Sequence, residues 1–159
     1  MSVGDWGSGD HIASIYVDGV EKQIHQNNKL SAIYTGNYTH SIPFSVTRTK
    51  DEITAGTWWQ PITSVNVHSI VNVHFWQTDV PPWGLIGIGH SGGVNYTVFH
   101  TDDSGVIEPY EYWFTFLVPA GWTIYVAFAQ HSDWGHGSKN TYTMNGRFFI
   151  SESISYWHY

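Results

Sequence analysis

The chain has 159 residues, of which 42% are hydrophobic, 17% aromatic and 12% charged, and its formal net charge is −7. A chain of this length buries a single core without covalent cross-links, so we expect one domain over residues 1–159. The excess of acidic side chains argues against nucleic-acid binding, which requires a basic surface, and the lack of cysteine excludes disulfides, zinc–thiolate sites and thiol nucleophiles.

The N-terminal third is predicted to consist of strands. Its first residues have neither a basic start nor an apolar run, so we expect no signal peptide and a protein that is cytoplasmic or secreted by a non-classical route. The dipeptide Asp18-Gly19 is favoured in hairpin turns, and it separates alternating segments at residues 11–17 and 20–25. Further strands are predicted at residues 30–34, 41–49 and 53–59.

Alternation is clearest in residues 64–76. The odd positions include Val71, Val73 and Phe75, whereas the even positions include His74 and Trp76. Because successive side chains of a strand point to opposite faces, this pattern predicts one long strand with a buried face and a mixed polar face.

Two more alternating segments, residues 110–118 and 122–130, flank the turn Pro119-Ala120-Gly121, and we expect them to form an antiparallel hairpin. No segment of the sequence has apolar residues at helical spacing. Turn residues recur about every 8–12 residues, which is typical of β-sandwiches and β-barrels. We therefore predict an all-β, single-domain antiparallel β-sandwich. The remaining predicted strands are residues 85–88, 95–101, 142–150 and 153–157.

The chain carries nine Trp, ten Tyr and eight Phe, more rings than its core is expected to hold. Loops rich in polar and aromatic side chains are predicted at residues 77–84, 101–105 and 131–140. Because loop backbone must remain solvated, Trp83 and Trp134 are predicted to be exposed contact residues. This surplus of rings favours a function in recognition.

The loop at residues 131–140 has the groups that a sugar site uses. Trp134 offers an aromatic face for the apolar side of a sugar ring, and polar groups beside it would pair with the hydroxyls. The structural alternative is that Trp134 closes the end of the sandwich and Asp133 caps a turn; Trp83, after two prolines, has the same two interpretations. The predicted polar partners are His131, Asp133, His136 and Asn140.

A lipid headgroup is a second candidate ligand. The predicted hairpin would bring together five rings that could hold a quaternary ammonium group by cation–π attraction: Tyr110, Tyr112, Trp113, Trp122 and Tyr125. Phe114 and Phe116 continue the face of Tyr110, so only one side of the hairpin is available for binding.

The histidines and acidic residues predict no metal site and no cofactor. His68 and His74 would be about 20 Å apart on one strand, too far to share an ion. His131 and His136 flank a loop, but their spacing is not specific for zinc. The run at residues 102–105 is more typical of a turn than of a calcium site.

Paired carboxylates are the basis for an enzymatic alternative. Glu108 and Glu111 lie among aromatic residues and resemble the nucleophile strand of small jelly-roll xylanases. A retaining glycosidase needs a second carboxylate about 5 Å away, and Glu152 is the candidate. The residues around Glu152 differ from the surroundings of the acid in that family.

The segment Trp113-Phe114-Thr115-Phe116-Leu117-Val118-Pro119 resembles the actinoporin-like superfamily of sea-anemone cytolysins and fungal fruit-body lectins. The resemblance covers about a tenth of the chain and implies a β-sandwich with Val118, Pro119 and Trp122 near a ligand. The chain departs from the toxins at Leu117 and at Ala120-Gly121, and residues 1–9 are rich in glycine and are not predicted to form an amphipathic helix that could enter a membrane. The resemblance thus favours lectin-like binding over pore formation.

The sequence therefore predicts a non-catalytic, lectin-like protein that binds a glycan or a phospholipid headgroup. Weak single sites gain avidity when they are linked, so we expect a homo-oligomer. The alternatives are a membrane-binding cytolysin with peripheral membrane contact and a small glycoside hydrolase.

Overall fold

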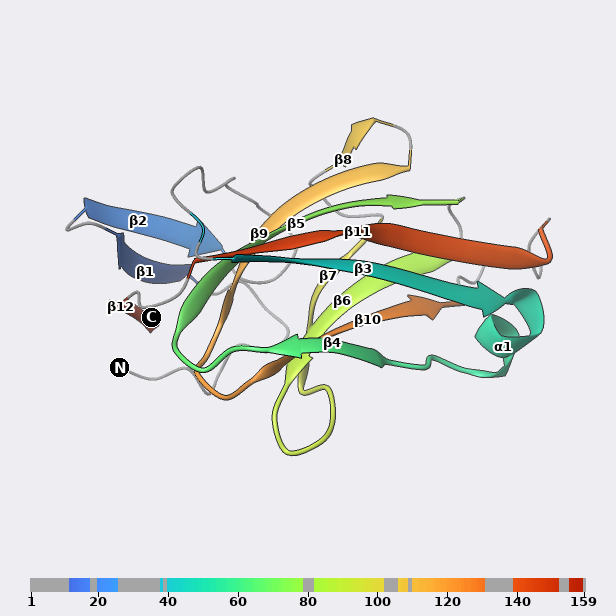
Figure 1. Cartoon of the computed structure of the whole chain (residues 1–159), viewed down its shortest axis with the longest axis horizontal. Helices are drawn as coiled ribbons and strands as arrows, with labels where there is room; N and C mark the ends of the chain where they lie inside the picture. The colour runs from blue at the N-terminus through green and yellow to red at the C-terminus, as the bar shows by residue number, and fades with distance from the viewer. Residues whose placement is uncertain are drawn as a thin grey trace.

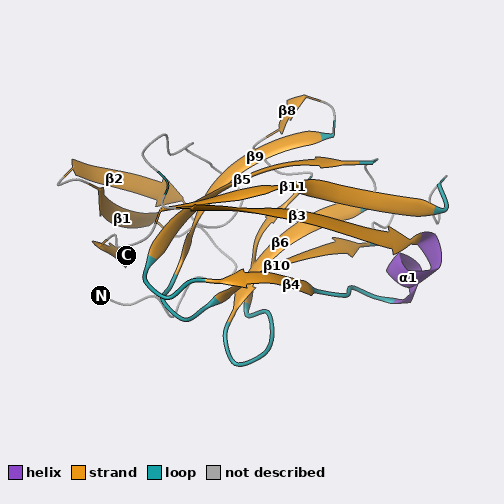
Figure 2. Ribbon diagram, in the orientation of Figure 1, coloured by secondary structure: helices purple, strands orange, loops and turns teal. Residues whose placement is uncertain are grey.

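A computed structural model describes residues 12–17, 20–25, 38, 40–78, 82–101, 106–108, 110–130, 139–151 and 155–158. These ranges contain twelve strands and one short helix, which is the single purple element of Figure 2. The strands are β1 (Ile12–Val17), β2 (Val20–His25), β3 (His40–Thr49), β4 (Gln60–Ser64), β5 (Ser69–Gln77), β6 (Trp83–Gly89), β7 (Tyr96–His100), β8 (Val106–Glu108), β9 (Glu111–Val118), β10 (Thr123–Ala129), β11 (Thr141–Ser151) and β12 (Ser155–His158), and the helix is α1 (Lys50–Ala55).

All strand pairs in the described residues are antiparallel, and they form three sheets. The two larger sheets have the orders β4-β10-β6-β7 and β3-β11-β5-β9-β8, and they pack face to face (Figure 1). The third sheet, β12-β1-β2, lies at one end of the molecule. The predicted antiparallel β-sandwich is therefore confirmed.

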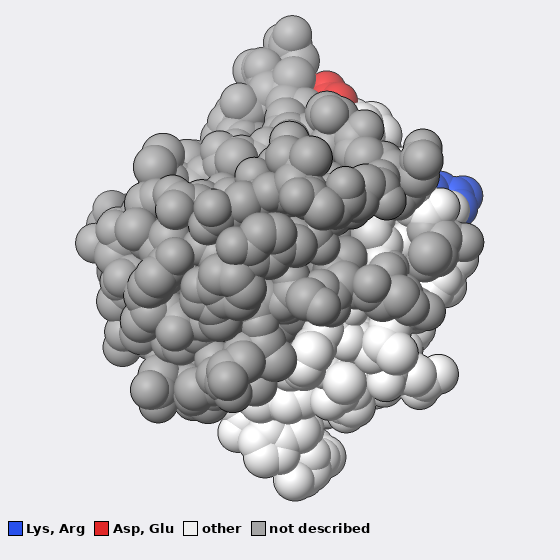
Figure 3. Space-filling model, turned by 90° about the vertical axis from the view of Figure 1, so that its left-hand side faces the viewer, with Lys and Arg blue, Asp and Glu red and all other residues white. Residues whose placement is uncertain are grey.

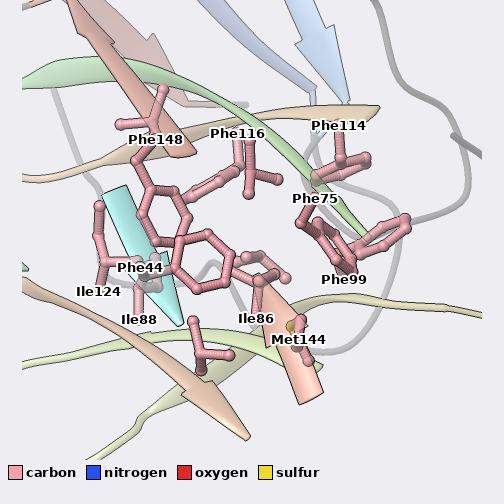
Figure 4. Packing of buried hydrophobic residues seen from close by; sticks show 14 of the residues in the cluster. Phe44, Phe75, Ile86, Ile88, Phe99, Phe114, Phe116, Ile124, Met144 and Phe148 are labelled. Atoms are coloured by element: carbon pink, nitrogen blue, oxygen red, sulfur yellow. The ribbon is translucent and has the colours of Figure 1, made fainter. Parts of the chain in front are cut away.

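The core fills the space between the two larger sheets (Figure 4). Alternate residues of the five-stranded sheet point inward, among them Phe75 and Phe116, and the opposite sheet supplies Ile86, Phe99 and Ile124. The rings of Phe75 and Phe99 meet across the interface edge to face, with centroids 6.0 Å apart. Much of the aromatic surplus is thus consumed by the core.

Helix α1 lies where the sequence predicted a strand at residues 53–59, so that prediction was wrong. Thr49 caps the helix: its hydroxyl accepts a hydrogen bond from the Glu52 amide at 3.1 Å, and its own amide donates to the Glu52 carboxylate at 2.8 Å. These bonds lower the pKa of the Glu52 carboxyl below 4.5. A helix of six residues has too few turns to show helical periodicity, but Thr-x-x-Glu is a capping-box signal.

The single long strand predicted at residues 64–76 was also wrong, because the chain leaves one sheet and enters the other at residues 65–68. β4 ends at Ser64 in the four-stranded sheet, and β5 begins at Ser69 in the five-stranded sheet. Val67 is exposed in this connection, although the alternation placed it on the buried face.

The predicted hairpin of residues 110–118 and 122–130 does not form. β9 pairs with β5 and β8, whereas β10 pairs with β4 and β6. The turn at residues 119–121 connects the two sheets instead, and Gly121 has a φ of 85°, which suits glycine. The aromatic side chains of β9 and β10 therefore belong to different layers.

Other sequence predictions agree with the structure. β1 pairs with β2 in the register of a hairpin, with Val17 opposite Val20. The strands predicted at residues 41–49, 85–88, 95–101 and 142–150 correspond to β3, β6, β7 and β11, and that at 153–157 overlaps β12. The strand predicted at residues 30–34 lies outside the described residues.

Figure 3 shows the end of the molecule at the left of Figure 1, where the visible described surface is mostly uncharged.

Candidate ligand-binding face

The outer face of the five-stranded sheet carries a grid of side chains whose rows are fixed by the strand register. One row runs Glu111, Trp76, Asn145 and Ser45 across β9, β5, β11 and β3. The adjacent row, two residues along each strand, runs Trp113, His74, Arg147 and Pro43. Alternate residues of a strand share a face, so these two rows lie side by side.

Five rings on this face contact one another, and we call them the outer aromatic cluster: Tyr38, His74, Trp76, Trp113 and Phe149. The His74 ring lies between two indoles, with its centroid 4.3 Å from that of Trp76 and 4.5 Å from that of Trp113. Phe149 follows at 6.2 Å from Trp113, and Tyr38 lies 5.4 Å from Phe149. Four segments of the chain thus contribute to one aromatic surface.

Glu111 holds the His74 ring in place. The His74 Nε2 and Glu111 Oε1 atoms are 2.7 Å apart, and the two side chains are only 23% and 21% exposed. An ionised carboxylate only accepts hydrogen bonds, so His74 Nε2–H donates to Glu111. The indole Nε1 of Trp113 is buried beside this pair and has no hydrogen-bond partner within the described part of the chain.

The face is open at one end and covered at the other. Trp76 is 43% exposed, and Asn145, Arg147 and Ser45 are also exposed. At the other end Ile70, Asn72, Thr115 and Leu117 are fully buried. Thr115 donates a hydrogen bond to Asn72, which in turn donates to Tyr38. β2 contacts β9, and Figure 1 shows the small sheet beside the end where β5 begins.

A groove of about 290 Å³ lies between β3 and β4, the edge strands of the two larger sheets. Its wall is mixed in character, with the apolar Pro61 and Ile62 beside the polar Ser45 and Thr47. Arg48 crosses the groove wall, donating to the Thr47 carbonyl at 3.0 Å and to Gln60 Oε1 at 3.4 Å. Ser45 and Pro43 belong both to this groove and to the rows of the outer face.

The predicted site residues do not form one cluster in the described structure. Tyr112 is 3% exposed and packs on Phe75 at 5.1 Å, so it is a core residue and not a surface contact. Trp122 lies against the other sheet and stacks on Tyr96, with centroids 5.8 Å apart. The cage predicted from Tyr110, Tyr112 and Trp122 is therefore not assembled by a hairpin.

The other predicted residues have separate surroundings. Tyr110 is 44% exposed, with a φ of 68°, and its carbonyl accepts a hydrogen bond from the Gln77 amide. Trp83 is half-buried and stacks on His100 at 5.2 Å. Asn140 is exposed, and its carbonyl accepts from the Lys50 amide. His131, Asp133, Trp134, His136 and Glu152 lie outside the described residues.

The residues implied by the family resemblance are mostly enclosed. Val118 is fully buried and Pro119 is buried, whereas Trp122 is partly exposed at the edge of the core. The outer aromatic cluster, in contrast, was not predicted. Its signal was the shared face of His74 and Trp76 and that of Glu111 and Trp113, but only the register of β5 with β9 joins them.

No protein-family model matches the chain, and no curated protein matches it in sequence. The described residues contain no group of three His, Asp or Glu side chains that could hold a metal ion. None of the helices in the described part of the chain is long and apolar enough to cross a membrane.

Proposed function

We propose that this chain is a lectin-like carbohydrate-binding protein whose ligand stacks on Trp76, at the open end of the outer aromatic cluster. The observation that carries the proposal is an exposed indole with a fixed hydrogen-bonding pair, His74 and Glu111, at its side.

A sugar ring has an apolar face and a polar rim, and both meet a counterpart here. The indole of Trp76 covers the apolar face, because a broad ring buries much area at little cost in side-chain entropy. The remaining lone pairs of the Glu111 carboxylate accept from hydroxyls, and Arg147 donates to them from the neighbouring strand. The contacts among His74, Trp113 and Glu111 order these groups before binding, which lowers the entropic cost of association.

We favour binding over catalysis because the Glu111 carboxylate is already engaged in holding His74. That carboxylate accepts the His74 hydrogen bond, which fixes the ring between the two indoles. The hydrolase and cytolysin alternatives remain outcomes of the experiment below.

A glycan array probed with the wild-type chain and with Trp76→Ala tests the proposal. We expect binding to weaken at least about tenfold in Trp76→Ala, equivalent to about 1.4 kcal/mol. Trp58→Ala is the matched control, because Trp58 is 57% exposed but lies on the connection between α1 and β4. It should bind as the wild type does.

Three results would contradict the proposal: no glycan bound, equal binding by Trp76→Ala, or equal loss in both variants. Release of reducing sugar that is lost in Glu111→Gln would establish the hydrolase. Leakage of dye from sphingomyelin vesicles would establish the cytolysin.

A further inference from the structure

Resting on the proposed carbohydrate-binding function, we infer that the ligand is a neutral, linear oligosaccharide and not a single terminal sugar. It lies across the strands of the five-stranded sheet, from Trp76 on β5 to the groove between β3 and β4. The inference names the ligand class and adds a second binding region at the sheet edge.

The strand register aligns the side chains along which the ligand would lie, and we call this row the path. Trp76 is paired with Asn145 on β11, and Asn145 is paired with Ser45 on β3, so the three side chains form a line perpendicular to the strands. All three are exposed. Neighbouring strands are about 4.8 Å apart, so the row from Glu111 to Ser45 spans on the order of 14 Å. That span is longer than a single sugar ring.

The path ends at the groove between β3 and β4. β3 is the edge of its sheet, and Ser45 at the end of the row also lines the groove of about 290 Å³. Apolar Pro61 and Ile62 beside hydroxyl-bearing Ser45 and Thr47 match a ligand that has both apolar faces and hydroxyl rims. The Nε atom of Arg48, a lining residue, is buried and has no acceptor among the described residues.

The charges along the path favour a neutral ligand. Glu111 and Arg147 lie in adjacent rows, on strands separated by β5, and carry opposite formal charges. Arg48 lines the groove, and its charge adds a small contribution to the lowered pKa of Glu52, after the hydrogen bonds that Glu52 makes with Thr49. The described path thus places one carboxylate and two guanidinium groups apart from one another and forms no cluster of cations, so an anionic chain would meet repulsion at Glu111.

Pro43 and Pro61 argue for a saccharide over an extended peptide at this edge. Proline has no backbone N–H, so each removes a donor that an added strand would need. Hydroxyl groups bind side chains and do not depend on a continuous row of backbone donors.

Native gels containing soluble polysaccharides test the inference. The neutral probes are β-glucan, xylan, glucomannan and galactomannan, and the anionic probe is polygalacturonate. We expect at least one neutral polysaccharide to retard the protein, and polygalacturonate not to retard it. Calorimetry with fragments of the polysaccharide that retards the protein, from the monosaccharide to the hexasaccharide, should then show that affinity rises at least about tenfold along the series.

Asn145→Ala reports on the path itself. It should weaken binding of the hexasaccharide more than that of the disaccharide, because only the longer chain reaches beyond Trp76. Asn66→Ala is the matched control, since Asn66 is an exposed asparagine on the connection between β4 and β5. It should leave the whole series unchanged.

The outcomes separate the two proposals. Equal affinity for monosaccharide and hexasaccharide, with binding still lost in Trp76→Ala, would overturn the extended path and keep the lectin. Retardation by polygalacturonate alone would overturn the neutral ligand. Binding of no saccharide, or binding indifferent to Trp76→Ala, would overturn the carbohydrate-binding function itself.

Discussion

The two faces of the five-stranded sheet are made by the same strands and differ completely in character. On β5 the inward positions Val71, Val73 and Phe75 are fully buried, while His74 and Trp76, which alternate with them, reach the outer surface. On β9, Phe114 and Phe116 enter the core, whereas Glu111 and Trp113 stand on the outside. The same strands therefore carry a buried face and a partly exposed face, one residue apart.

The aromatic rings of this sheet divide into rings that build the core and rings that stay at the surface, where the proposed function would use them. Phe116 contacts Phe114 and Phe148 inside the sandwich, with centroids 6.2 and 6.3 Å away. Trp76 has one ring contact among the described residues, with His74, and is 43% exposed. Only rings of the second kind can be changed without loss of the core.

The largest expected effect comes from exchanging rings on the inner face. Phe116→Ala should lower the free energy of unfolding by about 3–5 kcal/mol, because it removes a fully buried ring and leaves a cavity. Trp76→Ala should change it by less than about 1 kcal/mol, since the site is at the surface. Urea unfolding monitored by circular dichroism measures both. Similar losses in the two variants would show that the outer ring also supports the fold.

An intermediate effect is expected at the covered end of the outer face. Asn72→Ala removes the acceptor of the Thr115 hydroxyl and the donor to Tyr38, at a fully buried position. Loss of such a partner costs about 1–3 kcal/mol of unfolding free energy.

The double variant Asn72→Leu/Thr115→Val is the control, because it removes both polar groups and fills their space. It should recover part of the stability lost in Asn72→Ala. If the double variant is no more stable than the single one in urea, the unpaired Thr115 hydroxyl is not what destabilises Asn72→Ala, and the prediction is wrong.

Local pattern in the sequence was enough for the inner face and not for the outer one. Alternation in residues 110–118 correctly placed Phe114 and Phe116 inside, because burial follows from a period of two along one strand. The same alternation could not tell that β9 pairs with β5 and not with β10, since register depends on contacts distant in sequence. The contact of His74 with Glu111 and Trp113 therefore could not be predicted, and the hairpin that was to bring the other rings to Trp122 does not form.

The smallest expected effect is a pH dependence at the connection between the sheets, which belongs to neither face. Burial lowers the pKa of His68 below its ordinary value of 6.5, and its Nδ1 accepts a hydrogen bond from the Ala120 amide at 3.0 Å. Below about pH 6.5 the unfolded chain therefore binds a proton that the folded chain does not, so stability falls as the pH drops toward the lowered pKa. His68→Gln keeps a side-chain acceptor and cannot titrate. Urea unfolding at pH 7.5 and 5.5 should show a smaller pH dependence in this variant than in the wild type, because the two chains differ only in the group at position 68. An equal pH dependence would mean that His68 is solvated like a surface histidine and that its burial does not affect stability.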